Sequence, residues 1–198
     1  MKRLIICLLC LTTFCSANAQ SLDLRLLEHI NGPVSSSDQT WRDVSTSTYF
    51  AITLVPATML ITGLAEHDKE LTVKSFEVGG SIVIASLSTV ILKDITNRER
   101  PYLAYPNLIT GKSAEPGSSF PSLHSSAVFA TATSLSLSFP KWYVIAPSFA
   151  YAATVGYSRL YLGVHYPSDV AAGALIGAGS SFLTWKLQKL LNKRYHYH

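Results

Sequence analysis

The chain has 198 residues, a formal net charge of +4 and 14% charged residues, well under the roughly 25% that soluble domains carry. Hydrophobic residues make up 48% of the chain, which excludes a disordered protein, because disordered segments are polar and strongly charged. No internal repeat is visible, which argues against a solenoid. The remaining classes are a compact apolar globule and a helical bundle in a membrane.

The N-terminus resembles a secretory signal. Residues 1–3 are basic, residues 4–14 are almost entirely apolar, and residues 16–19 (SANA) offer the small-x-small pattern of a signal peptidase site. We expect residues 1–19 to be a cleaved signal peptide and residues 20–198 to form a single helical domain. The alternatives are a first transmembrane helix, for which the run is short, and a lipoprotein at Cys15, where the preceding Phe14 is bulky.

Cleavage at this site would change the chemistry that the chain offers. It would remove all three cysteines, so cysteine catalysis, thiolate metal sites and disulfides are not expected. It would also remove Lys2 and Arg3 and lower the formal charge by two. Since no stripe of arginine and lysine remains, we expect no nucleic-acid partner.

The next segments predict helices. Leu22 to Ile30 has apolar residues at helical spacing and is closed by Asn31-Gly32-Pro33, which predicts a short amphipathic helix. Val34 to Ser47 is rich in serine, threonine and aspartate and is predicted to be a loop. Five apolar segments rich in small residues follow, and strand alternation is absent. These segments are Thr48–Leu64, Val78–Leu92, Ala127–Phe139, Trp142–Gly156 and Val170–Leu183. The predicted fold is an all-α bundle of about five transmembrane helices plus the N-terminal helix.

Soluble core helices could have a similar composition, and most of the segments are short for a span. Two features favour the membrane: aromatic residues gather at segment edges, and a lysine-rich stretch at 186–194 is typical of a cytoplasmic end. With the mature N-terminus outside, we expect a multi-pass protein of a bacterial inner membrane. In this arrangement, three stretches of unusual polar residues share the outer, periplasmic face: residues 93–101, 119–125 and 158–169.

These stretches contain the side chains that a phosphate site requires. Lys93, Arg100 and Arg159 suit an anion with several oxygens, because arginine binds such oxygens bidentately and lysine acts as a point charge. Ser122 precedes a helix expected to start near His124, and backbone N–H groups at a helix N-terminus attract anions. There are two alternatives: Lys93 and Arg100 could anchor the protein at the membrane–water interface, and Ser122 could be only an N-cap.

Two histidines can divide the work of catalysis. His124 and His165 could divide the nucleophile and general-acid roles between them, and Asp169, four residues after His165, could face that ring and stabilise its charged form. Each piece has a structural alternative, such as a capping histidine or a surface ion pair. The joint occurrence of all these residues favours a catalytic site.

The ordered motifs K-x6-R-P, P-S-x-H and S-R-x5-H-x3-D resemble those of the type 2 phosphatidic acid phosphatase superfamily, which also includes vanadium haloperoxidases. The resemblance implies a metal-independent phosphohydrolase without a cofactor. His165 would attack phosphorus and form a phosphohistidine, Asp169 would orient His165, and His124 would protonate the leaving oxygen. The phosphate oxygens would be held by Lys93, Arg100, Ser122, the Leu123 N–H and Arg159. Leu123 departs from the family, which usually has glycine there, and its side chain would reshape the pocket.

The expected substrate is a lipid phosphate in the bilayer, and no obligate protein partner is evident. A signal peptide and a compact five-helix length resemble the lipid A phosphatases of the family, so a lipid A phosphate is favoured. The alternatives are undecaprenyl diphosphate or phosphatidylglycerol phosphate, a soluble periplasmic acid phosphatase, and a non-catalytic lipid-binding scaffold.

Overall fold

The computed structural model describes residues 22–195, with side chains up to residue 191, and every regular element within that range is helical. The predicted signal peptide, residues 1–19, lies outside the described residues. A helix over residues 22–31 comes first, close to the predicted amphipathic helix. The later helices are α2 (Asp38–Ala65), α3 (Lys69–Thr96), α4 (Pro101–Ala104), α5 (Leu123–Ser138), α6 (Trp142–Tyr161) and α7 (Pro167–Tyr195).

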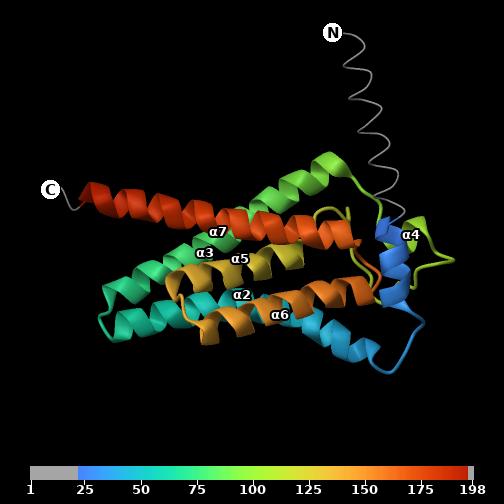
Figure 1. Cartoon of the computed structure of the whole chain (residues 1–198), viewed down its shortest axis with the longest axis horizontal. Coiled ribbons are helices and arrows are strands. Elements are labelled where there is room, and N and C mark those ends of the chain that lie inside the picture. The colour runs from blue at the N-terminus through green and yellow to red at the C-terminus, as the bar shows by residue number, and fades with distance from the viewer. Residues whose placement is uncertain (1–21, 196–198) are drawn as a thin grey trace, which may run out of the picture.

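The five long helices run side by side and alternate in direction (Figure 1). The starts of α2, α5 and α7 and the ends of α3 and α6 therefore lie at the same end of the bundle. The helix over residues 22–31, short α4 and the loop of residues 105–122 cover this end. This topology confirms the predicted all-helical bundle and brings the three polar stretches together.

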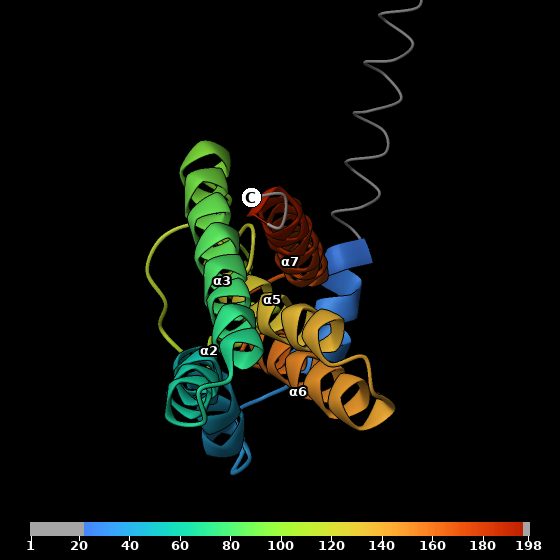
Figure 2. The ribbon, with the colours of Figure 1, turned by 90° about the vertical axis from the view of Figure 1, so that its left-hand side faces the viewer.

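Helix α5 is the centre of the bundle (Figure 2) and contacts α2, α3, α6 and α7. Its core positions are small residues such as Ala127 and Ala130, which let the neighbouring helices approach closely. With 16 residues it is about 24 Å long, shorter than the roughly 30 Å hydrocarbon core of a bilayer. Helix α5, which begins within the second motif, is thus an internal helix surrounded by longer ones.

Glycines bring α7 against α5. A Cβ at Gly173 would lie 2.6 Å from the Ser122 carbonyl oxygen, and one at Gly177 would lie 2.3 Å from the Ser126 carbonyl oxygen. The two backbones therefore meet with no room for a side chain. This contact fixes the start of α5 relative to the start of α7, where the second and third motifs lie.

The outer faces of the bundle are apolar, as expected for helices in lipid. Three segments are long and apolar enough to cross a membrane: Asp38–Ala65, Lys69–Ala104 and Pro167–Leu191. Exposed large hydrophobic side chains lie on them, including Phe50, Leu54, Ile61, Phe76, Val83, Leu87, Leu175, Phe182 and Leu183. The protein is therefore a membrane protein. The expected number of five spans is not established by length and hydropathy, since α5 and α6 are not among these segments.

The structure corrects the predicted loop at residues 34–47, because α2 begins at Asp38, ten residues before the first apolar segment. The polar first turns are stabilised by tertiary contacts that composition does not show. The buried Asp38 carboxylate accepts a hydrogen bond from the Tyr161 hydroxyl at 2.9 Å and lies 3.3 Å from the Lys112 ammonium. Helix propensity is a weak guide where such contacts exist.

The helix over residues 22–31 is attached to the same end of the bundle. The Asn31 side chain donates to the Thr110 and Tyr161 carbonyls at 2.9 and 2.8 Å and accepts from the Thr110 N–H at 2.7 Å. Leu27 packs in a small apolar cluster with Ile109 and Tyr166. These contacts fix the N-terminal helix beside the residues that precede α7.

Candidate active site

The three polar stretches meet at one end of the bundle, on different elements. The last turn of α3 and the segment before α4 carry the first stretch, the segment into α5 carries the second, and the α6–α7 connection carries the third. The backbone links the second and third stretches directly, because the Ser122 N–H donates to the Asp169 carbonyl at 3.0 Å. The predicted convergence of these stretches is confirmed.

His165 and Asp169 face each other across the start of α7. The Nδ1 atom of His165 lies 3.4 Å from Oδ2 of Asp169, and both side chains are almost fully buried. Nδ1 has no hydrogen-bond partner in the part of the chain that the structure describes, so the carboxylate lies beside the ring without a hydrogen bond to it. Oδ2 also accepts the Tyr166 N–H at 2.9 Å, which holds the carboxylate toward the ring.

The other ring nitrogen of His165 faces the cations. Its Nε2 lies 3.4 Å from Nη1 of Arg100. Burial, together with the positive charges of Arg159, Arg100 and Lys93, holds the pKa of His165 well below its usual value. The imidazole is therefore neutral near pH 7, the form in which a ring nitrogen has a lone pair to attack with.

Arg100 and Lys93 both donate hydrogen bonds to the same loop. The Arg100 guanidinium donates to the carbonyls of Pro116, Gly117 and Val164 at 2.8 to 3.0 Å, and its residue is 3% exposed. The Lys93 ammonium donates to the Ser118 carbonyl. Both cations are thereby held by residues 116–118 of the loop between α4 and α5, immediately before the second motif.

Arg159 projects from the last turn of α6 and is 1% exposed. Its Nη1 donates to the Ser45 hydroxyl on α2, and its Nη2 donates to Oε1 of Glu115 at 2.7 Å. Its Nε–H is buried and has no partner in the described part of the chain. A buried guanidinium with a free N–H has the donor capacity that an additional anion oxygen would use.

The second motif forms the N-terminus of α5. The fully buried Ser122 hydroxyl accepts the Ser125 N–H at 3.4 Å and the Ser125 hydroxyl at 3.0 Å, so it caps the helix. Leu123 is the first helical residue and is half-buried. The structural alternative for Ser122, an N-cap, is thus realised, and the cap fixes the direction of the first N–H groups of α5.

His124 lies in the first turn of α5 and is buried. Its ring meets the Tyr49 ring edge-on, with centroids 5.3 Å apart. Together with Arg159 and Glu115 it lines a small polar pocket between the starts of α2 and α5. Burial and the positive charge of Arg159 lower the pKa of His124 to about 3, so its ring is neutral near pH 7. His124 therefore shares a pocket with Arg159, one of the cations whose charge also acts on His165.

The structure adds Arg98, which the sequence did not single out. Its Nη1 donates to Oδ1 of Asp169 at 2.6 Å and to the Ser168 hydroxyl at 2.7 Å. Its Nη2 pairs with Asp23 at 2.9 Å, and the guanidinium stacks 3.9 Å from the Tyr166 ring centroid. Arg98 therefore holds the carboxylate that faces His165. Its only sequence signal is its place inside the first motif, two residues before Arg100.

Glu115 and Asp23 are two further acidic residues that the sequence did not indicate. Asp23, on the N-terminal helix, accepts the Ser168 N–H at 2.9 Å and the Ser168 hydroxyl, close to Asp169. Burial raises the pKa of Glu115, but the charge and hydrogen bond of Arg159 outweigh it, so this pKa lies below its usual value. Both residues lie outside the three motifs, so their spacing carried no signal.

Comparisons with known proteins agree with this geometry. The family model described as "PAP2 superfamily" matches residues 74–193, which include all three motifs. The crystal structure of Aquifex aeolicus LpxE superposes with a TM-score of 0.70 and 30% sequence identity, covering 83% of this chain and 95% of that one. The chain is thus similar in fold over nearly the whole length of that protein.

Two curated relatives match over a shorter region. An undecaprenyl-diphosphatase of Sulfolobus acidocaldarius is 34% identical over 116 residues, which cover 57% of this chain and 56% of that protein. A lipid A 4'-phosphatase of Bacteroides thetaiotaomicron is 34% identical over 99 residues, which cover 50% of this chain and 44% of that protein. The chain spans about half the length of these curated relatives.

Proposed function

The chain belongs to the PAP2 superfamily, and from this premise we propose that it is a metal-independent phosphatase acting on a membrane lipid phosphate through a phosphohistidine. The single observation that carries the proposal is the setting of His165. One ring nitrogen faces the Asp169 carboxylate and the other faces the Arg100 guanidinium, both at 3.4 Å. An imidazole that lies between a carboxylate and the buried cations Lys93, Arg100 and Arg159 is arranged to attack a bound phosphoryl group.

In the first step, the Nε2 lone pair of His165 would attack phosphorus while the bond from phosphorus to the lipid oxygen breaks. The negative charge of the bound phosphate would raise the lowered pKa of His124, and protonated His124 would then give its proton to that oxygen, so the lipid would leave as a neutral alcohol or as a shortened phosphate. The Asp169 carboxylate would stabilise the positive charge that develops on the His165 ring. The buried cations Lys93, Arg100 and Arg159 would hold the non-bridging oxygens in place for this step.

In the second step, water would attack phosphorus and the bond from phosphorus to Nε2 would break. His124 would take the proton from the water, which returns both histidines to their starting forms and releases inorganic phosphate. The free Nε–H of Arg159 and the first N–H groups of α5, including that of Leu123, would complete the binding of the phosphate oxygens.

We propose a lipid A phosphate as the substrate, with undecaprenyl diphosphate and phosphatidylglycerol phosphate as the alternatives. The apolar outer faces of α2, α3 and α7 lead up to the cationic end of the bundle, so lipid tails could stay in the bilayer while the headgroup reaches His165. The similarity to a lipid A 4'-phosphatase supports a lipid A phosphate as the substrate. The similarity to an undecaprenyl-diphosphatase supports undecaprenyl diphosphate as an alternative.

The proposed location is a bacterial inner membrane with the site on the periplasmic face. The alternation of the five long helices supports a multi-pass arrangement in which all three motifs share one face. Three segments are long and apolar enough to cross a membrane, which argues against the alternative of a soluble periplasmic acid phosphatase. Carbonate extraction separates the two locations, because an integral protein remains in the membrane fraction.

The test of the function is phosphate release by the detergent-solubilised full chain from lipid A, undecaprenyl diphosphate and phosphatidylglycerol phosphate, with and without EDTA. We expect release that a chelator does not change, an acid-labile phosphoenzyme in a rapid quench, and loss of both in His165→Ala. Substantial hydrolysis by His165→Ala would overturn the assignment of the nucleophile. No release from any lipid phosphate would favour the non-catalytic lipid-binding scaffold.

A further inference from the structure

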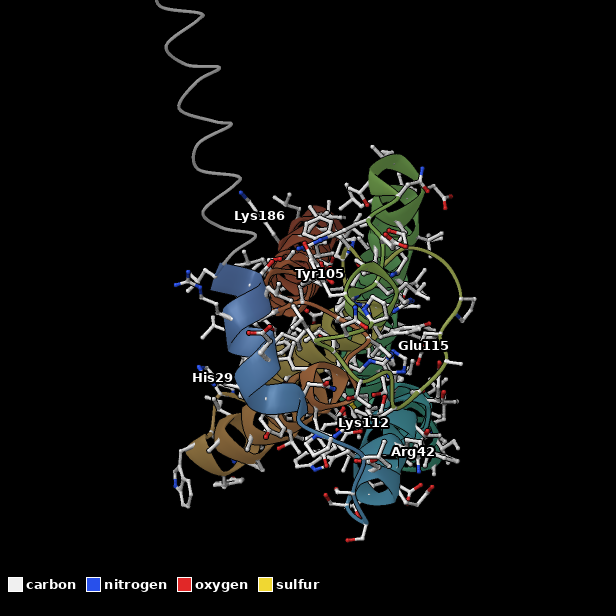
Figure 3. The ribbon with its side chains drawn as sticks, turned by 90° about the vertical axis from the view of Figure 1, so that its right-hand side faces the viewer. His29, Arg42, Tyr105, Lys112, Glu115 and Lys186 are labelled. Atoms are coloured by element: carbon white, nitrogen blue, oxygen red, sulfur yellow. The ribbon has the colours of Figure 1, made fainter. Side chains whose placement is uncertain are left out.

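A carboxylate lies among the cations of the candidate phosphate site. Glu115 comes from the loop of residues 105–122, and its Oε1 accepts a hydrogen bond from Nη2 of the buried Arg159 at 2.7 Å. The same loop holds Lys112, whose carbonyl accepts a hydrogen bond from Arg42 of α2 at 3.0 Å, and Arg42 and Glu115 line the same small pocket (Figure 3). Glu115 is thus a negative group at the position where the site is expected to bind another negative group.

The Arg159 side chain is only partly satisfied by this contact. Its Nε–H and Nη2 form one edge of the guanidinium, the edge that binds two oxygens of a phosphate side by side. Glu115 takes the Nη2 donor, and the buried Nε–H has no partner in the described part of the chain. A phosphate could accept both hydrogen bonds at once, whereas the observed carboxylate accepts one.

Glu115 is also able to leave. Its side chain is 23% exposed, while that of Arg159 is 1% exposed, so only the glutamate has an open path away from the pair. It is carried by a loop rather than by one of the packed helices. Arg159 would keep its position without Glu115, because its Nη1 is held by the Ser45 hydroxyl on α2.

We propose that Glu115 occupies the place of a phosphate oxygen on Arg159 and that a phosphate anion must displace it to bind. Glu115 then determines how tightly the site binds phosphate, and it limits occupancy by free inorganic phosphate, which lacks the lipid contacts of a substrate. This proposal rests on the proposed function, because it assumes that Lys93, Arg100 and Arg159 bind a phosphate.

Two further observations support the competition. The pKa of Glu115 is lowered by Arg159 in spite of burial, so the carboxylate is ionised near pH 7 and competes as an anion. His124 shares the small pocket of Glu115 and Arg159, so a displaced Glu115 would also clear the space beside the proposed acid. Removing the charge of Glu115 should therefore favour phosphate without disturbing the framework.

The experiment measures binding of inorganic phosphate and of orthovanadate to the full chain in detergent by calorimetry, which needs no turnover. We expect Glu115→Gln to bind both anions about tenfold more tightly than the parent, the gain from freeing one charge-assisted hydrogen bond. Glu115→Ala should shift affinity in the same direction. The matched control is Glu99→Gln, which makes the same charge change at an exposed position of the first motif and should leave affinity unchanged.

The outcomes separate this proposal from the proposed function. If the parent binds phosphate and hydrolyses lipid phosphate, but Glu115→Gln and Glu115→Ala bind phosphate equally or more weakly, Glu115 is a structural partner of Arg159 and the competition is wrong. An equal gain in Glu99→Gln would also overturn the competition, because general charge would explain it. If the parent neither binds phosphate nor releases it from any lipid, both proposals fail.

Discussion

Arg98 and Asp169 form an ion pair in which Nη1 of the arginine lies 2.6 Å from Oδ1 of the carboxylate, directly behind the contact between Asp169 and His165. The carboxylate is fully buried, whereas the arginine side chain is 24% exposed. Arg98 touches neither His165 nor any of the proposed phosphate ligands in these contacts. Its effect on catalysis should therefore pass through the position of Asp169.

Replacing Arg98 by glutamine should lower kcat about tenfold to hundredfold with little change in KM. This is the range typical of residues that orient a metal ligand, and Arg98 orients Asp169 in the same way. Arg98→Lys should recover part of the loss, because it keeps the charge but cannot reach Asp169, Ser168 and Asp23 together. Steady-state kinetics on a lipid phosphate checks this. Arg25→Gln, an exposed change on the N-terminal helix, is the control. A rise in KM at constant kcat would instead assign Arg98 to substrate binding.

The contact between α5 and α7 gives a second prediction. A Cβ at Gly177 would meet the Ser126 carbonyl oxygen at 2.3 Å and the Ala130 nitrogen at 2.7 Å, both backbone atoms. Gly177→Ala should force the helices apart and lower stability by about 1–3 kcal/mol. Gly179→Ala is the matched control on the same helix, since nothing lies within 4 Å of its added Cβ, and it should be neutral or stabilising by up to about 1 kcal/mol.

Thermal unfolding in detergent and turnover measure the effect of these two variants. Activity should fall in Gly177→Ala along with the melting temperature, because α5 and α7 deliver the second and third motifs. Equal melting temperatures in the two alanine variants would contradict the close backbone approach.

The proposed acid role of His124 predicts that its loss depends on the leaving group. His124→Ala should lower kcat on a lipid phosphate by about 10²- to 10⁴-fold, the usual contribution of a general acid. An activated aryl phosphate, whose leaving oxygen needs no proton, should restore the first step but not breakdown of the phosphoenzyme. Burst-phase kinetics separates these steps. If phosphate binding is intact and the aryl phosphate gives no burst, the acid role is wrong.

The neutral state of His165 predicts a stability change in mild acid. Burial and the neighbouring cations hold its pKa in the folded protein well below 6.5, whereas the unfolded chain takes up the proton near 6.5. The unfolded state then binds more protons below pH 6.5, so stability falls as the pH falls. One such group contributes at most about 1.4 kcal/mol per pH unit.

Melting curves measured between about pH 7.5 and 5.5 test this effect. The decrease in melting temperature should be smaller in His165→Gln than in the parent, while a variant of the exposed His29 should follow the parent. Glu115 acts at lower pH, because its folded pKa lies below 4.5 and its stabilising charge is lost only as the pH falls toward that value. Parallel curves for His165→Gln and the parent would show that the His165 ring is already protonated when folded.

The architecture could be predicted largely from the sequence because apolar segments and polar motifs alternate along it. Five apolar segments predicted five long helices, and antiparallel neighbours necessarily bring residues 93–101, 119–125 and 158–169 to one end. The spacing of His165 and Asp169 also predicted that they face each other, and they lie 3.4 Å apart. These features depend on local pattern and on chain direction, which a single sequence contains.

The remaining features depend on contacts between distant residues. The polar start of α2 is helical because Asp38 meets Lys112 and Tyr161, more than 70 positions away in the chain. Arg98 and Glu115 resemble solvated loop charges until the fold places them on Asp169 and Arg159. Composition and spacing carry no information about such pairs, so only the assembled bundle identifies them.

The bond between Asp23 and Ser168 has a consequence for biosynthesis. These residues are separated by 145 positions, yet the carboxylate of the first accepts the backbone N–H of the second, one residue before Asp169. A nascent polypeptide therefore cannot assemble the candidate site until translation has passed the start of α7 and this segment has folded back onto the helix over residues 22–31. A truncated product that ends before α7 would lack both Ser168 and Asp169, and we expect it to release no phosphate from a lipid.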